Sequence, residues 1–326
     1  MLAACLTGLQ AQNVEMLTTL SGASFRGIAC WGDEQIWVSG SGGKIGRSID
    51  AGKTWHWISP AGYEAFDFRD IEVFSENAAV VLSAGSPAVI LTTQNGGESW
   101  TEVFRDTRAE IFLDGMEFDG NHGFIIGDPI DGAFQLLESK DRGKTWDDVS
   151  NVMYLFADDG EVAFAASGTS LHLKGKNLYL GTGGVTASLF TRKTRKPAVI
   201  KIPVPIIQGI ASTGIFSIDC WDQENIIAVG GDYMNDTVST DAALISYDGG
   251  YNWKKPETTT SGYKSCVKYL TKERIIATGT SGTDISNDGG LNWRQISKDS
   301  FHCLAKGKSG DIVYLAGDKH IAKITF

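Results

Sequence analysis

The octapeptide Ser48-Ile-Asp50-Ala-Gly52-Lys-Thr54-Trp55 decides the fold, because its pattern occurs five times in the chain. The shared pattern is Ser/Thr-x-Asp/Asn-x-Gly-x-Thr/Ser/Asn-Trp. The further copies are residues 93–100, 139–146, 246–253 and 286–293. Repetition of one motif at this length indicates a repeat architecture, in which each copy marks one structural unit.

The chemistry of the octapeptide is that of a hairpin turn. Short oxygen-bearing side chains can accept hydrogen bonds from their own backbone amides, and the glycine can adopt a positive φ. The tryptophan that follows can start the next strand and pack its ring into an apolar layer. We therefore predict that the acidic residue of each box is structural and not catalytic.

A second periodic element sets the number of units. An aromatic residue opens an apolar stretch seven times, at intervals of about 40 to 50 residues, the size of a four-stranded propeller blade. The openers are Phe25, Phe68, Phe112, Phe164, Phe216, Tyr263 and Phe301. The 39 glycines and only 7 prolines also suit short strands joined by tight turns. We predict an all-β fold, a seven-bladed β-propeller of four-stranded blades.

Two units depart from the pattern. The fourth has a basic turn within residues 188–197 in place of the box, and the seventh ends at Phe326 after only three predicted strands. An unpaired outer edge would invite aggregation. We therefore expect residues 14–20 to pair beside residues 312–326, to close the last blade and to make residues 13–326 a single propeller domain.

The boxes resemble the Asp-box (BNR-type) repeats of bacterial neuraminidases. A ring of seven such blades resembles the Ycf48-like photosystem II assembly factor family and its relatives in non-photosynthetic bacteria. The resemblance covers residues 14–326. It implies the fold but carries little about function, because Asp boxes occur in sialidases, other glycosidases, sorting receptors and assembly factors.

The N-terminal residues 1–12 look like the back half of a secretory signal. Cleavage after Ala11 would release a secreted or periplasmic protein, whereas Leu2-Ala3-Ala4-Cys5 resembles a bacterial lipobox and would make Cys5 a lipid anchor. Both readings lack a basic segment in front, which leaves a cytoplasmic chain as the third alternative. We expect export, to the periplasm or outside the cell.

Four cationic or titratable side chains directly follow an opening aromatic in units that are neighbours around the predicted ring. They are Arg26, Arg69, Lys264 and His302. Together they predict a basic arc at the mouth of the central channel that binds an anion or a carboxylate, since arginine suits bidentate pairing. The alternative is that they pair internally with Asp70, Asp114 or Asp219, or face water.

Two loops between second and third strands add candidates for the same face. Residues 127–132 contribute Asp128 and Asp131, and the long polar insertion at residues 230–241 contributes Asp232 and Tyr233. Long loops on a rigid scaffold often bind ligands. The insertion is expected to form a lip over the mouth or a weak cation site, and the alternative is a solvated loop.

Several function classes are disfavoured. The net charge of −10 argues against nucleic acid as the main partner. There is no GxGxxG, no CxxC among the five cysteines and no ligand cluster among the five histidines, so we expect no cofactor and no metal. No apolar run has the 18 residues of a membrane span.

Two functions remain. A glycoside hydrolase needs a pair of carboxyl groups at a defined separation, and the candidates Asp70, Asp114, Asp128, Asp131 and Asp219 include no pair that the sequence singles out. A non-catalytic scaffold needs only the mouth face, with the basic arc binding acidic side chains or a C-terminal carboxylate of a protein or peptide partner. We favour the scaffold, and carbohydrate is the alternative ligand.

Overall fold

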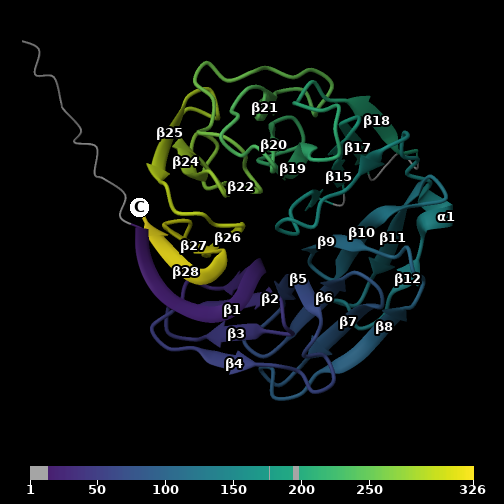
Figure 1. Cartoon of the computed structure of the whole chain (residues 1–326), viewed down its shortest axis with the longest axis vertical. Helices are drawn as coiled ribbons and strands as arrows, with labels where there is room; N and C mark the ends of the chain where they lie inside the picture. Colours follow the sequence, from purple (N-terminus) through teal and green to yellow (C-terminus); the bar gives the residue numbers. More distant parts are fainter. Residues whose placement is uncertain (1–13, 176, 194–197) are drawn as a thin grey trace, which may run out of the picture.

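The fold is all-β, as predicted. A computed structural model describes residues 14–175, 177–193 and 198–326. The strands form antiparallel sheets set around a common central axis (Figure 1), and α1 (Ser150–Met153) is a single helical turn at the periphery. No described helix has the length and apolar character needed to cross a membrane. The predicted signal segment with Cys5 lies outside the described residues.

Four-stranded sheets are the recurring unit. In three of them each strand pairs with the next one along the chain. The first is β5 (Asp67–Val73), β6 (Ala79–Ala84), β7 (Ala88–Thr93) and β8 (Thr101–Asp106). The second is β9 (Leu113–Asp119), β10 (His122–Ile130), β11 (Ala133–Ser139) and β12 (Asp147–Asp148). The third is β22 (Cys266–Tyr269), β23 (Ile275–Gly279), β24 (Gly282–Ser286) and β25 (Trp293–Ser297).

The two ends of the chain share one long sheet. Its order is β26 (Cys303–Lys306), β27 (Ile312–Ala316), β28 (Asp318–Thr325), β1 (Val14–Trp31), β2 (Gln35–Gly40), β3 (Ile45–Ser48) and β4 (His56–Ile58). The first part of β1 pairs with β28, with Val14 opposite Ile324, and the second part pairs with β2. The predicted pairing of residues 14–20 beside the C-terminal strands is therefore observed.

The middle of the chain is less regular. One sheet is β14 (Leu171–Lys174), β15 (Asn177–Gly181), β17 (Ser188–Arg192) and β18 (Ile200–Pro203). The next joins β13 (Glu161–Val162) and β16 (Gly183–Gly184) to β19 (Thr213–Cys220), β20 (Ile226–Asp232) and β21 (Ala243–Ser246). The prediction of a strand opened by Phe164 is wrong, because residues 164–170 form turns and the inner strand of this unit begins at Leu171.

The hydrophobic core lies between neighbouring sheets. One apolar cluster joins Trp37 and Ile45 to Phe68 and Val81, so it lies between the sheet of β2 and that of β5. Other clusters occupy the corresponding spaces around the axis, including the one where β22 and β23 face β26 and β27. Each sheet is therefore covered on both faces, which explains the continuous apolar runs of its central strands.

The Asp boxes form the predicted turns. In the first box, Asp50 Oδ1 accepts from the Thr54 amide at 2.8 Å and Ser48 Oγ accepts from the Gly52 amide at 2.9 Å. The hydrogen bonds from Thr54 lower the pKa of Asp50 to about 2. Gly52 has a φ of 85°, and a Cβ there would collide with Leu17 of β1. The turn of the first box therefore packs closely against the first part of β1.

Candidate functional site

The innermost strands carry backbone irregularities where the candidate residues lie. The pairing register shifts between Phe25 and Gly27 in β1, and between Phe68 and Asp70 in β5. Such a β-bulge inserts one extra residue and changes the direction of its side chain. Arg26 and Arg69 are these inserted residues, so the backbone turns both guanidinium groups towards the axis at the same end of the ring.

A cavity of about 240 Å³ lies at this end of the axis, and we call it the mouth pocket. Its lining combines two arginines with aromatic and small side chains. The lining residues are Arg26, Arg69, Phe164, Ala165, Ala166, Phe216, Tyr233, Tyr263, Thr280 and His302. No carboxylate is among these described residues. The pocket therefore has the chemistry of an anion site with an apolar wall.

The two arginines differ in their partners. The Arg69 Nε donates to Asp67 Oδ2 at 2.7 Å, and its Nη1 donates to the Ala165 carbonyl at 3.0 Å. The guanidinium of Arg26 makes no ion pair or hydrogen bond within the described ranges. Burial, with repulsion from Arg69, lowers the pKa of Arg26. An arginine remains protonated in spite of such a shift, so an unpaired positive charge faces the pocket.

The opposite wall is aromatic. The rings of Phe164 and Phe216 stack with their centroids 3.8 Å apart. Tyr263 meets Phe216 edge-on at 4.8 Å, and Tyr233 does so at 6.0 Å. The Thr280 hydroxyl, which also lines the pocket, is buried and has no hydrogen-bond partner among the described residues. The wall can therefore cover an apolar group while leaving one hydroxyl free to donate to a ligand.

His302 lines the mouth pocket but contributes no positive charge to it near neutral pH. It is 9% exposed, and its pKa is lowered to about 4 by burial and by the nearby Arg26. The ring is therefore neutral near pH 7. The predicted basic arc is reduced here to two permanent charges.

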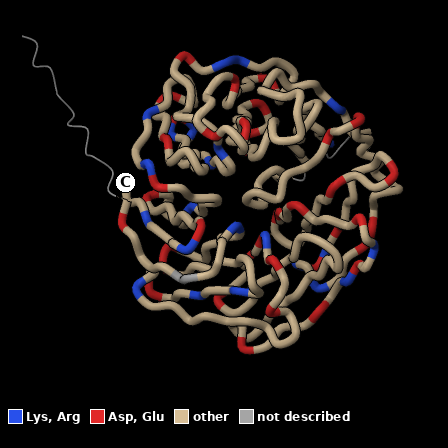
Figure 2. Tube along the Cα trace, viewed as in Figure 1, with Lys and Arg blue, Asp and Glu red and all other residues tan. Residues whose placement is uncertain are grey.

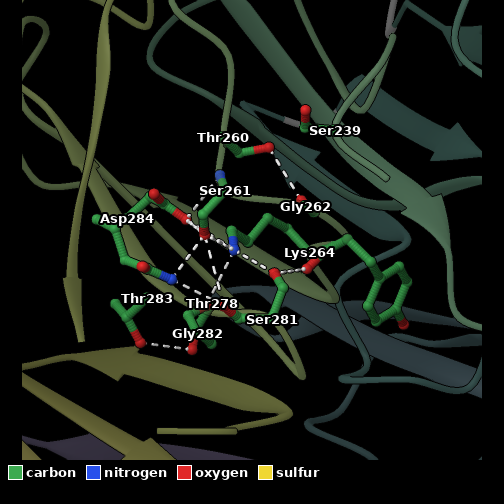
Figure 3. A network of polar contacts seen from close by, with 12 residues as sticks. Ser239, Thr260, Ser261, Gly262, Lys264, Thr278, Ser281, Gly282, Thr283 and Asp284 are labelled. Carbon is green, nitrogen blue, oxygen red and sulfur yellow. Dashed lines mark hydrogen bonds and ion pairs between the residues drawn. The ribbon is translucent and has the colours of Figure 1, made fainter. Parts of the chain in front are cut away.

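The prediction that Lys264 joins the arc is wrong. Its side chain is fully buried, and its ammonium lies 2.7 Å from Asp284 Oδ2. It also donates to Ser281 Oγ at 2.6 Å and to Ser261 Oγ at 3.0 Å (Figure 3). The Ser281 hydroxyl in turn donates to the Tyr263 carbonyl. Lys264 therefore stabilises the turn around Ser281, next to Tyr263 of the aromatic wall. Its side chain points inward because it pairs with Asp284 on β24, and no sequence motif marks Asp284 as that partner.

Asp70 and Asp219 connect adjacent sheets instead of lining the mouth pocket. Asp70 Oδ2 accepts from the Met116 amide at 2.7 Å, and Asp219 Oδ2 accepts from the Tyr269 amide at 2.6 Å. Burial raises the pKa of Asp70 to about 8, although hydrogen bonds from the Met116 and Ile71 amides oppose the shift. Both carboxylates satisfy backbone donors of the next inner strand, so they hold neighbouring sheets together around the axis.

The remaining acidic candidates are dispersed. Asp114 is buried and its Oδ2 has no hydrogen-bond partner. Burial, and secondarily Asp128, raises the pKa of Asp114 well above its ordinary range, and burial raises that of Asp128 to about 6. Asp128 accepts a hydrogen bond from the Ala163 amide. Neither residue lines the mouth pocket.

Asp131 and Asp232 serve local turns. Asp131 and Gly132 both have positive φ values, 53° and 76°, and form the tight connection between β10 and β11. The predicted loop at residues 127–132 is therefore mostly strand. Asp232 Oδ1 accepts from the Met234 amide, which turns the chain so that Tyr233 reaches the pocket. Across the described ranges, no group of three or more acidic, histidine or cysteine side chains is arranged to hold a metal ion.

Sequence reasoning missed the segment that forms one wall. Residues 163–170, which we call the crossing segment, reach other sheets across the axis: Ser167 Oγ donates to the Ser265 carbonyl at 2.6 Å, and Thr169 Oγ1 bonds Ser217 Oγ at 2.6 Å. A Cβ on Gly168 would collide with the Asp70 carboxylate. The run of small residues from Ala165 to Ser170, which lacks β-branched alternation, was the available signal.

Comparison with known proteins agrees with this architecture. A sequence profile for the photosynthesis system II assembly factor YCF48 matches residues 70–159. A solved structure described as YCF48 bound to D1 peptide superposes with a TM-score of 0.68 at 15% identity, covering 97% of each chain. YCF48 from Cyanidioschyzon merolae gives 0.66 at 15%, covering 97% of this chain and 99% of its own. The predicted resemblance to Ycf48-like BNR propellers is confirmed.

Other propellers are also similar in fold. The GH74 enzyme of Niastella koreensis has a TM-score of 0.63 at 15% identity, with 96% of this chain covering 53% of that one. A sequence search of curated proteins finds no match. At these identities the structural likeness establishes the propeller fold and leaves the activity open.

Proposed function

We propose that this chain is a non-catalytic scaffold that binds a peptide segment of a protein partner at the mouth pocket, with a carboxylate of the peptide held by Arg26. The observation that carries the proposal is the unpaired guanidinium of Arg26 in a partly buried pocket. Burying a charge without a partner is costly. A carboxylate ligand would remove that cost.

The aromatic wall supports a peptide over a small inorganic anion. Phe164, Phe216 and Tyr263 offer an apolar surface in the same pocket as the two arginines. A peptide can place an apolar side chain there and its carboxylate at Arg26. One similar propeller is described as bound to a D1 peptide, which makes a peptide the ligand class of choice.

We further propose that the scaffold is one seven-bladed domain spanning residues 13–326. The proposal is supported by the pairing of Val14 with Ile324 and by an apolar cluster in each space between neighbouring sheets. In this arrangement β1 belongs to two blades, its first part to the last blade and its second part to the first. Export through residues 1–12 is proposed on the sequence of that segment.

A peptide array tests the binding site. The full chain is incubated with short peptides that carry an acidic side chain or a free C-terminal carboxylate next to apolar residues, and with their amidated counterparts. We expect the carboxylate peptides to bind, and the double variant Arg26→Met, Arg69→Met to bind them more than about tenfold more weakly. The matched control is Arg105→Met, Arg108→Met, because these exposed arginines pair with Glu102 and Asp106 away from the pocket. Unaltered binding by the mouth variant would refute the site.

Glycoside hydrolysis is the second candidate, because a GH74 enzyme shares the fold. The best candidates for its catalytic acids are Asp114 and Asp128. Burial raises the pKa of both, and the charge of Asp128 raises that of Asp114 further. A raised pKa is what a general acid needs. Release of reducing sugar from β-glucans by the wild type, lost in Asp114→Asn and Asp128→Asn, would favour this candidate over the scaffold.

A further inference from the structure

A second cavity lies on the same axis at the other end of the ring. It has a volume of about 350 Å³, and we call it the lower chamber. Residues from the inner strands around the axis line it. Its acidic and basic lining residues are Asp70, Glu72, Glu117, Lys174, Asp219, Lys268 and Lys306. The volume falls within the range of small-molecule sites.

The crossing segment separates the lower chamber from the mouth pocket. Ala165 and Ala166 line the mouth pocket, whereas Ser167, Gly168 and Thr169 line the lower chamber. Hydrogen bonds from this segment to Ser265 and Ser217 fix it across the axis. A ligand in the lower chamber therefore occupies a different site from the proposed peptide.

Two acidic side chains and two lysines of the lower chamber lie on different pairs of inner strands. Glu72 belongs to β5 and Glu117 to β9, while Lys268 belongs to β22 and Lys306 follows on β26. In Figure 1, β22 and β26 lie across the centre of the ring from β5 and β9. Figure 2 shows acidic and basic residues scattered over the ring as a whole. The chamber thus has an acidic wall at β5 and β9 and faces it with Lys268 and Lys306, while Lys174 of β14 and Asp219 of β19 lie between these two groups along the chain.

Lys268 and Glu72 differ in their contacts from Glu117, whose Oε1 lies 3.4 Å from Nδ1 of His172. Within the described part of the chain, neither Lys268 nor Glu72 has an oppositely charged group within 4.0 Å. Lys268 nevertheless affects the pKa of Glu117: burial acts to raise that pKa, and Lys268, His172 and Lys174 together outweigh it, so the net shift is downward. Lys268 and Glu117 therefore interact without forming a direct ion pair.

We propose that the lower chamber binds a small zwitterion of the free amino acid or dipeptide class. Its ammonium group would lie at Glu72 and Glu117, and its carboxylate at Lys268, with Lys174 at the rim. A simple anion would meet the acidic wall, and a simple cation would meet the lysines. Trp221 and Phe118 also line the chamber, so an apolar or aromatic side chain on the ligand has a surface to pack against.

Three ligands of one size test the proposal by titration calorimetry on the full chain. Phenylalanine carries both charges, phenethylamine carries only the ammonium, and 3-phenylpropionate carries only the carboxylate. We expect phenylalanine or the dipeptide glycyl-phenylalanine to bind, and both single-charge analogues to bind at least about tenfold more weakly. Equal binding of either analogue, or no binding of any of the four compounds, would overturn the proposal.

Substitutions in the two cavities show where phenylalanine binds. Glu72→Gln and Lys268→Met should each weaken phenylalanine binding by at least about tenfold, with the melting temperature recorded to show that each variant is folded. The control Arg26→Met changes the mouth pocket and should leave phenylalanine binding unchanged. Because Arg26→Met should weaken peptide binding by at least about tenfold, the proposals for the two sites can be refuted independently. Loss of phenylalanine binding in Arg26→Met, or its retention in Glu72→Gln and Lys268→Met, would place the ligand elsewhere.

Discussion

Arg26 and Lys264 occupy the same repeat position, directly after the opening aromatic of their units, yet their surroundings are opposite. Lys264 is fully buried and has Asp284 and two serine hydroxyls as partners. Arg26 faces a cavity without an ion pair in the described ranges. The repeat therefore sets the backbone position of a side chain. Whether that side chain stabilises the fold or can bind a ligand depends on whether another strand supplies an oppositely charged partner.

The largest expected effect comes from removing the partnered cation. Lys264→Met leaves Asp284 buried without its ion-pair partner, which should lower the free energy of unfolding by about 3 to 5 kcal/mol. Chemical denaturation measures this difference. Replacing both partners, Lys264→Met with Asp284→Leu, should recover part of the loss. A single variant as stable as the wild type would contradict the structural role of Lys264.

The next effect compares two aspartates that both stand two residues after an opening phenylalanine. Asp70 accepts backbone N–H groups on both of its oxygens, from Ile71 and from Met116. Asp70→Asn replaces one acceptor by a donor and should cost about 1 to 3 kcal/mol of unfolding free energy.

Asp114→Asn is the matched control for Asp70→Asn. The Oδ2 of Asp114 has no hydrogen-bond partner in the described part of the chain, and burial raises the pKa of its carboxyl group well above the ordinary range. Asparagine at this position breaks no hydrogen bond to Oδ2 and carries no charge to bury, so the change should alter stability by less than about 0.5 kcal/mol. Equal losses in the two variants would remove the distinction.

The unpaired cation should affect binding and not stability. Arg26→Met is expected to weaken carboxylate-peptide binding by at least about tenfold. It should not lower the melting temperature, because the variant removes a buried unpaired charge and its repulsion with Arg69. Fluorescence titration and thermal melting of the same sample give both values. A large fall in melting temperature would mean that Arg26 has a structural partner.

The smallest effect is expected from His302. Its pKa of about 4 in the folded chain lies below its ordinary value of 6.5, so it is neutral from pH 6 to 8 and peptide affinity should be constant there. As the pH falls from 6.5 towards 4, the unfolded chain takes up the proton first and the fold loses stability. His302→Gln should lessen that loss. A rise in affinity between pH 8 and 6 would show that His302 is charged at the site.

The sequence predicted the elements that depend on local chemistry. The box turns follow from hydrogen bonds between residues at most four positions apart, such as Ser48 to Gly52, and the N-terminal pairing follows from a missing strand. Arg26 and Arg69 were identified because each directly follows an opening aromatic, and in the structure both positions are β-bulges. These features are readable because their causes are close together in the chain.

The sequence did not predict features that depend on distant partners. The crossing segment meets Arg69 and Ser265 nearly a hundred residues away in the chain. Asp284 turns Lys264 inward from another strand, and Asp219 bonds an amide of the next sheet. The sequence analysis predicted that Phe164, Phe216 and Tyr263 open strands, but not that their rings come together in one wall. Each of these contacts is a property of the assembled ring, so no local motif encodes it.

A crystal structure of the protein soaked with a short acidic peptide tests the central claim most directly. We expect peptide density in the mouth pocket, with a carboxylate at hydrogen-bonding distance from the Arg26 guanidinium and an apolar side chain against Phe164 and Phe216. A peptide bound elsewhere, with the mouth pocket empty, would contradict it.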